Sequence, residues 1–244
     1  MAPQLPVPQV PPVPQAPRTA FLVRTHNPSI AQMERMRGWA AELAGTEFAF
    51  FVSVDVTQPA GQLTAARLSQ VLPPQCLHTY SEADLLARYF ASLRYFVQPE
   101  LFPGGHLQAE VYHGRRREGF SVAWALHAEP ICLFAVAALG LQVDFLWVVE
   151  DDVGFSGDLP CFLRAYAQDP ADLVTNTASP SCAYRPAVVR RGVVVRPTEG
   201  WFWHDAVTPA YAAAVPSHAR YKTNEHVQRL SQRLLHTLDT LSAH

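Results

Sequence analysis

The chain has 244 residues, 49% of them hydrophobic and 16% charged, and its 19 basic and 21 acidic side chains give a formal net charge of −2. This balance argues against a nucleic-acid-binding protein, which usually has a clear basic excess, and the high apolar content argues against an intrinsically disordered chain. No apolar run in the sequence reaches the roughly 18 residues of a transmembrane helix, and the N-terminal residues lack the basic and apolar regions of a signal peptide.

The N-terminal segment is rich in proline. Seven of the 21 prolines lie within residues 1–17, and such a segment favours extended polyproline conformations and cannot form a packed core. We predict a flexible leader over residues 1–18, with a Pro-rich ligand for an SH3-like partner as the alternative. The remaining residues, 19–244, have a length that suits one domain.

From residue 19 onward, strand and helix patterns alternate. Short apolar runs predict strands at residues 19–24, 48–54 and 76–80. The second run is apolar almost throughout, as in a strand buried on both faces of a parallel sheet, and Asp55 follows at its carboxyl end. Ser29 is a predicted helix N-cap, and Ser81 forms a capping-box pattern with Asp84 before a second amphipathic helix.

The second half of the chain continues this alternation. Residues 98–119 are predicted to form a long loop, and residues 120–139 a helix interrupted at Pro130. Further strands are predicted at 144–149, 172–175 and within 188–195, and helices at 159–166 and after Thr223. The last helix would carry apolar residues at helical spacing, namely Val227, Leu230, Leu234, Leu238 and Leu241. This order favours an α/β fold with a doubly wound, mostly parallel sheet and right-handed crossovers.

The most informative motif follows the strand at 144–149. Three consecutive acids, Glu150, Asp151 and Asp152, have no cationic neighbour in the sequence, which is unfavourable unless a positive group lies among them. On an extended strand, Glu150 and Asp152 would share one face and Asp151 would point to the other. Ligands bind at the carboxyl ends of strands in open α/β sheets, and carboxylates there suit Mg²⁺ or Mn²⁺ together with substrate phosphates. The alternative is a solvated acidic turn.

The segment VVEDDVGFSGDL, residues 148–159, resembles the acidic DxD-type motif of GT-A glycosyltransferases, which use nucleotide-sugar donors. The first strand, ending in Arg24-Thr25-His26-Asn27, is similar to the nucleotide-binding first strand of these enzymes. The resemblance is closest to eukaryotic and algal GT-A-like proteins with an EDD motif, and it covers most of the chain from residue 19. It implies a GT-A-like, Rossmann-type, mostly parallel sheet flanked by helices in a single domain.

The same resemblance implies a donor site. Asp152 would bind the metal ion, Mn²⁺ or Mg²⁺, and the two preceding acids, Glu150 and Asp151, would contact the nucleotide, its ribose or metal-bound water. Four residues at the ends of predicted strands are further donor-site candidates, with plain turn chemistry as the alternative: Arg24, Thr25, Asn27 and Asp55.

A second motif lies at residues 199–205, where three consecutive aromatic residues follow a glycine. Exposed Trp201 and Trp203 would stack on sugar rings, and His204 would hydrogen-bond sugar hydroxyls. Asp205 is the candidate general base for the acceptor hydroxyl. The alternative is an aromatic cluster in the core with a capping aspartate.

Three further features have both a functional and a structural interpretation. His127 and Glu129 would face a donor pocket or belong to a helix end near Pro130, with the structural interpretation favoured. Arg115, Arg116 and Arg117 would clamp a diphosphate or lie in a solvated loop. The four cysteines lack metal-site spacing, so we interpret most of them as buried apolar residues, with one disulfide left open.

These patterns together predict a metal-dependent glycosyltransferase that moves a sugar from a nucleoside diphosphate sugar donor to a hydroxyl group of a carbohydrate or glycoconjugate acceptor. One alternative is a non-catalytic, degenerate GT-A-like domain that binds a sugar or a protein. The other is a metal-dependent nucleotidyl or phosphoryl transferase. The resemblance also implies a further segment with a glycine and an acid beyond the last helix. The sequence stops at His244, so either the chain is truncated there, and we expect it to bind donor better than it transfers sugar, or Asp205 alone supplies the base.

Overall fold

The computed structural model describes residues 18–97, 123, 126–175, 178–180, 188–190, 193–195, 221–223 and 227–244. A six-stranded sheet with strand order β3-β2-β1-β4-β10-β5 forms its centre. The strands are β1 (Thr19–Thr25), β2 (Ala49–Asp55), β3 (Leu77–Tyr80), β4 (Phe145–Glu150), β5 (Leu173–Thr175) and β10 (Val227–Ser231). Strands β1 to β4 are mutually parallel, whereas β10 runs antiparallel to both β4 and β5. The α/β class is therefore confirmed, and the sheet is mixed.

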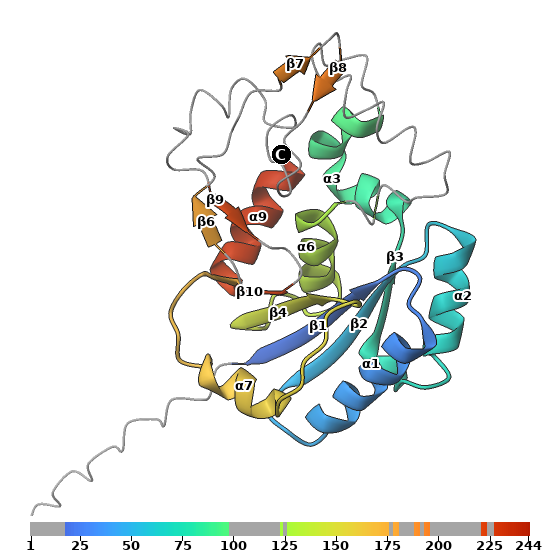
Figure 1. The fold of residues 1–244 in the computed structure, drawn as a ribbon, viewed down its shortest axis with the longest axis vertical. Coiled ribbons are helices and arrows are strands. Elements are labelled where there is room, and N and C mark those ends of the chain that lie inside the picture. Colours follow the sequence, from blue (N-terminus) through green and yellow to red (C-terminus); the bar gives the residue numbers. More distant parts are fainter. Residues whose placement is uncertain are drawn as a thin grey trace, which may run out of the picture.

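Helices cover both faces of this sheet in a single domain (Figure 1). On one face, α1 (Ile30–Leu43), α2 (Pro59–Leu68) and α7 (Leu159–Ala165) pack on alternate side chains of β1, β2 and β4. On the other face lie α3 (Glu82–Val97), α6 (Ala128–Ala137) and α9 (Gln232–Ala243). The strand residues alternate between these two cores: Phe21 and Val23 face α1, whereas Ala20 and Leu22 face α6 and α9.

The helix starts follow from local capping chemistry. Ser29 and Gln32 form a capping box at the start of α1, and Ser81 pairs with Asp84 before α3, where the Ser81 backbone N–H donates to Asp84 Oδ2 at 2.8 Å. After α1, Gly45 adopts a φ of +75°, a left-handed conformation that glycine accepts without strain. These local contacts determine where the helices that connect the strands begin and end.

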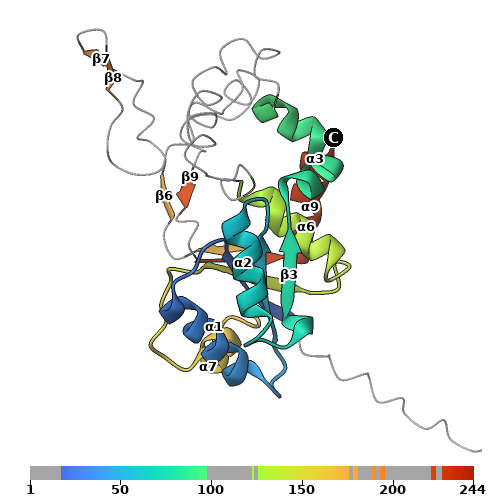
Figure 2. The same cartoon turned by 90° about the vertical axis from the view of Figure 1, so that its right-hand side faces the viewer.

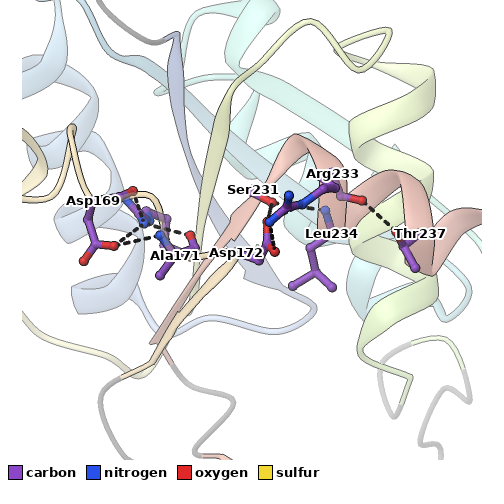
Figure 3. A network of polar contacts seen from close by, with 8 residues as sticks. Asp169, Ala171, Asp172, Ser231, Arg233, Leu234 and Thr237 are labelled. Atoms are coloured by element: carbon purple, nitrogen blue, oxygen red, sulfur yellow. Dashed lines mark hydrogen bonds and ion pairs between the residues drawn. The ribbon is translucent and has the colours of Figure 1, made fainter.

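The prediction of a single helix after Thr223 is wrong. Residues Val227–Ser231 form β10, and Ser231 caps α9 by accepting from the Leu234 backbone N–H at 3.1 Å. Figure 3 shows this junction, where Asp172 accepts hydrogen bonds from both Ser231 and Arg233. The spacing of Val227 and Leu230 fits a helix, but pairing with β4 and β5 buries this segment as a strand.

Buried Arg229 gives the physical reason for this strand. Its guanidinium donates to the backbone carbonyls of Tyr166, Asp169 and Ala171, which follow α7. It also lies 4.1 Å from the centre of the Phe145 ring. Only a strand inserted between β4 and β5 brings this side chain to those carbonyls, so tertiary contacts outweigh the local helical period.

Two other helices differ from what the sequence predicted. Helix α2 was not predicted, although Pro59 at its first position is a recognised start signal. The expected break at Pro130 is misplaced, because α6 begins at Ala128 and Pro130 lies in its first turn, where the missing N–H costs nothing. The expected helix at 159–166 and the strands at 144–149 and 172–175 are confirmed within a residue or two at their ends.

Two small strand pairs complete the described part of the chain. Strand β6 (Ala178–Pro180) pairs with β9 (Tyr221–Thr223), and β7 (Val188–Arg190) pairs with β8 (Val193–Val195), which agrees with the β-rich prediction for 188–195. Figure 2 shows both pairs away from the central sheet. No helix within the described residues has both the length and the apolarity needed to cross a membrane.

Candidate functional site

The candidate site lies at the carboxyl ends of β1, β2 and β4, where β1 is the middle strand. The chain leaves β1 through α1 on one face and enters β4 from α6 on the other face (Figures 1 and 2). In open α/β sheets, ligands bind at this kind of reversal, outside the carboxyl ends of the strands. The sequence places Arg24, Thr25, Asp55 and Glu150 at these three strand ends.

Strand register divides these residues between the two faces. Arg24 lies opposite Glu150 of β4 and Ser53 of β2, so Arg24, Glu150 and Asp55 share the face that α6 covers. Thr25 points to the opposite face, together with Asp151. Strand pairing and the hydrogen bond from Thr25 to Asp151 bring five of the sequence-predicted donor residues to this end of the sheet, all except exposed Asn27 and Asp152: Arg24, Thr25, Asp55, Glu150 and Asp151.

Asp151 is hydrogen-bonded to residues of β1 and α1. The Thr25 hydroxyl donates to Asp151 Oδ2, and the Gln32 side-chain amide donates to Asp151 Oδ1 at 3.3 Å. Burial raises the pKa of this carboxyl above its ordinary value, and the hydrogen bond from Thr25 partly opposes that effect. The contacts of Asp151 thus connect the acidic segment to the first helix.

Helix α1 also holds the rest of the acidic segment. The Arg35 guanidinium donates to the Val153 carbonyl at 2.6 Å, and Glu42 accepts from the Leu159 backbone N–H at 2.6 Å. Asp152 is exposed and lies between Asp151 and Val153, both of which are held by these contacts. The chain leaves the strand after Glu150 and turns, so strand alternation does not extend to Asp152, and its carboxylate is presented on an anchored turn.

Asp55 is a buried carboxylate at the end of β2 with only 2% of its surface exposed. Its Oδ1 accepts from the Thr57 backbone N–H at 2.9 Å, whereas Oδ2 has no hydrogen-bond partner within the described ranges. Helix α2 packs very closely here, because a Cβ on Gly61 would lie 1.8 Å from the Asp55 carbonyl oxygen. A buried acceptor of this kind is unusual in a purely structural position.

Arg24 is equally buried, with 1% of its surface exposed. Its Nη2 donates to the Leu126 carbonyl at 2.7 Å, and its Nη1 lies 2.9 Å from His127 Nδ1. Next to it, burial raises the pKa of Tyr80 to about 12, an effect that the nearby Arg24 partly opposes. Arg24 therefore supplies positive charge beneath the acidic segment.

His26 is a site residue that the sequence reasoning did not select. Burial lowers its pKa, as does the charge of Arg24, while the nearby carboxylates of Asp151, Asp55 and Glu150 act in the opposite direction. Its only sequence signal was its position directly after the first strand. The lowered pKa favours the neutral form of the His26 imidazole over the charged form.

The remaining predicted site residues divide into two groups. Trp201, Trp203, His204 and Asp205, like Arg115, Arg116 and Arg117, lie outside the described residues. His127 and Glu129 are described: His127 precedes α6 and contacts Arg24, and burial raises the pKa of Glu129, in the first turn of α6. Among the described cysteines, Cys76, Cys132 and Cys161 are free thiols.

Within the described part of the chain, no group of three or more His, Cys, Asp or Glu side chains could hold a metal ion. Mg²⁺ and Mn²⁺ are commonly held by one or two carboxylates, with substrate phosphates and waters completing the coordination. In such an arrangement, the exposed carboxylate of Asp152 on the turn after β4 would supply one protein ligand.

A scan against protein-family models finds no match for this chain, and a search of curated proteins finds no similar sequence. Function must therefore be argued from the site, since an α/β fold alone supports many activities.

Proposed function

We propose that the protein is a metal-dependent glycosyltransferase that moves a sugar from a nucleoside diphosphate sugar to a hydroxyl group of a carbohydrate or glycoconjugate acceptor. The observation that carries this proposal is the convergence of Glu150, Asp151 and Asp55 with Arg24 at the carboxyl ends of three adjacent strands. The likeness of residues 148–159 to a GT-A acidic motif supports the same assignment.

The anchored turn is the argument against a merely solvated acidic turn. Thr25 and Gln32 hold the Asp151 side chain at its start, and Arg35 and Glu42 hold the backbone at Val153 and Leu159. A solvated turn needs no such anchoring, whereas a ligand site gains from groups that are held in place before binding. Exposed Asp152 is then the carboxylate that binds Mn²⁺ or Mg²⁺.

Each described residue has a role consistent with donor binding. Asp152 holds the ion, which as a Lewis acid offsets negative charge on the leaving diphosphate when it is bound. Glu150 and Asp55 offer acceptor oxygens to hydroxyl or N–H groups of the donor. His26 adds a further polar group near them. For the acceptor side, Trp201, Trp203 and His204 would bind the sugar and Asp205 would be the general base.

The test measures the binding of UDP-, GDP- and CMP-sugars, with and without Mn²⁺, as a shift in the thermal unfolding temperature. A ligand at 100 times its Kd stabilises the native state by about 2.7 kcal/mol. We expect a Mn²⁺-dependent rise in Tm for one donor class and its loss in Asp152→Asn. The matched control is Glu47→Gln, which removes one carboxylate at the opposite end of the sheet, before β2.

The outcome that overturns the proposal is equal donor binding by the wild type and Asp152→Asn. Donor binding without hydrolysis or transfer would instead indicate a non-catalytic sugar-binding domain. A preference for nucleoside triphosphates over nucleotide sugars would indicate a nucleotidyl or phosphoryl transferase.

A further inference from the structure

His127 connects the candidate site to two distant parts of the sheet. Its Nδ1 lies 2.9 Å from Arg24 Nη1, at the carboxyl end of β1, and its Nε2 lies 2.9 Å from Gln228 Oε1 on the reversed strand β10. The neighbouring carbonyl of Leu126 accepts from the other guanidinium nitrogen of Arg24 at 2.7 Å. The residues before α6 therefore hold the Arg24 side chain through two of its nitrogens.

The chemistry of these contacts fixes the tautomer of His127. A guanidinium stays protonated and can only donate hydrogen bonds, so Nδ1 must be the acceptor from Arg24. A neutral imidazole with Nδ1 unprotonated carries its proton on Nε2. That proton is donated to Gln228, whose carbonyl oxygen must then face the ring, as the structure places it.

We propose that His127 is a positioning residue of the site, which as the neutral Nε2–H tautomer orients the Arg24 guanidinium beside Glu150 and which loses its hydrogen bond to Arg24 when Nδ1 is protonated, while the Leu126 carbonyl still holds Nη2. The consequence for ligand binding rests on the glycosyltransferase proposal, because Arg24 lies at the strand ends assigned to the donor. The tautomer itself does not depend on that assignment.

Protonation breaks the link for two reasons. A proton from solvent on Nδ1 would face an N–H of Arg24, so the hydrogen bond is lost, and the imidazolium would lie beside a second cation. Within the described residues, the charged and titratable groups near this link include Arg24 from β1, Glu150 paired with it from β4, Tyr80 of β3, which lies beside Arg24, and Glu129 on α6, whereas Gln228 from β10 is neutral. The nearest of these is the arginine, which opposes the imidazolium.

The first experiment observes the ring directly. Long-range proton–nitrogen NMR spectra of the full chain labelled at histidine, with His127 assigned by its absence in His127→Gln, report the tautomer. We expect protonated Nε2 and unprotonated Nδ1 at pH 7.5. A protonated Nδ1 at that pH, as the other tautomer or as the imidazolium, would overturn the proposal whether or not the protein binds a nucleotide.

The second experiment separates positioning from structure. In His127→Gln, the amide oxygen can accept from Arg24 and the amide nitrogen can donate to Gln228, but the side chain does not titrate. Between pH 7.5 and 5.5, Mn²⁺–UDP affinity should fall about ten-fold more in the wild type than in His127→Gln, a value within the usual range of coupling between sites.

The guanidinium signal of Arg24 provides a readout that needs no ligand. Its Nη1 group should become more mobile in acid in the wild type than in His127→Gln, while Nη2 stays bonded to the Leu126 carbonyl in both. Parallel pH dependences of this signal in the two proteins would contradict the positioning role. If Mn²⁺–UDP does not bind at all, the glycosyltransferase proposal fails. The NMR signals of Arg24 and His127 still decide whether His127 positions Arg24.

Discussion

Two partly buried aspartates should respond oppositely to the same Asp→Asn substitution. Asp239 on α9 accepts from Arg88 Nε at 2.9 Å, from Arg88 Nη2 at 2.6 Å and from the Tyr89 hydroxyl at 2.6 Å. Burial alone would raise its pKa, but the hydrogen bonds from Arg88 and Tyr89 outweigh burial and hold the pKa below the ordinary value. These contacts join α9 to α3.

The cost of Asp239→Asn follows from this geometry. The amide keeps one acceptor oxygen but places an NH₂ group against a donor of Arg88. Breaking a fully buried ion pair costs roughly 3–5 kcal/mol, but the Arg88 side chain is 35% exposed and that of Asp239 is 11% exposed. After allowing for solvent screening of the arginine, we expect a loss of about 2 kcal/mol. This is a large part of the roughly 5–15 kcal/mol that stabilises a typical domain.

Asp151→Asn is the matched control. Burial raises the pKa of Asp151, so its ionised form is disfavoured in the folded state at neutral pH. Asparagine keeps an acceptor for the Thr25 hydroxyl and removes the buried charge, and its NH₂ group displaces only the long, 3.3 Å hydrogen bond from the neutral Gln32 amide. We therefore expect Asp151→Asn to leave the free energy of unfolding unchanged or slightly increased, while it weakens donor binding.

Urea unfolding at several pH values measures both effects. Because the pKa of Asp239 is lowered by folding, its contribution is fully present above the unfolded value of about 3.9 and is lost as the pH falls further. The difference in unfolding free energy between the wild type and Asp239→Asn should therefore become smaller in acid. For Asp151, whose pKa is raised, the cost of the ionised form disappears as the pH falls through its folded pKa. The reasoning is refuted if Asp239→Asn changes stability by less than about 0.5 kcal/mol at pH 7, the range of an ordinary surface substitution, or if Asp151→Asn costs as much as Asp239→Asn.

Three further changes test the packing around the sheet. Gly61→Ala should destabilise the protein and disturb the end of β2, because the new Cβ would lie 1.8 Å from the Asp55 carbonyl oxygen; unaltered thermal unfolding would contradict this close approach. Ser231→Ala should cost about 1 kcal/mol, since it removes the N-cap that accepts from the Leu234 N–H, and chemical denaturation measures it. Burial raises the pKa of the Cys132 thiol to about 12, so it should resist a thiol reagent in the native protein and react only after unfolding.

Local signals in the sequence were enough to predict the first half of the sheet. The runs at residues 19–24, 48–54 and 76–80 are short and apolar, and the structure confirms a strand at each. The serines before α1 and α3 cap these helices by contacts three residues away. Patterns of this kind depend on neighbouring residues alone, so no knowledge of the tertiary structure is needed to interpret them.

The reversed strand could not be predicted in the same way. Val227, Leu230 and Leu234 recur at a spacing that suits a helix. Two tertiary contacts make the first part of this segment a strand. Its backbone pairs with the edge of β4, and Arg229 donates to backbone carbonyls that lie about 60 residues earlier in the sequence. Neither partner can be identified before the register of the sheet is known.

The candidate site illustrates the same limit. The sequence predicts that ligands bind at the carboxyl ends of the strands and that Glu150, Asp151 and Asp152 belong there. It cannot show that Thr25 meets Asp151, because the two residues are 126 positions apart and come together only through the pairing of β1 with β4. Strand alternation placed Asp151 correctly opposite Glu150. It does not apply to Asp152, since the chain turns after Glu150. The residue assigned to the metal therefore owes its position to the anchors from α1, and weakening those anchors should impair donor binding without removing any carboxylate.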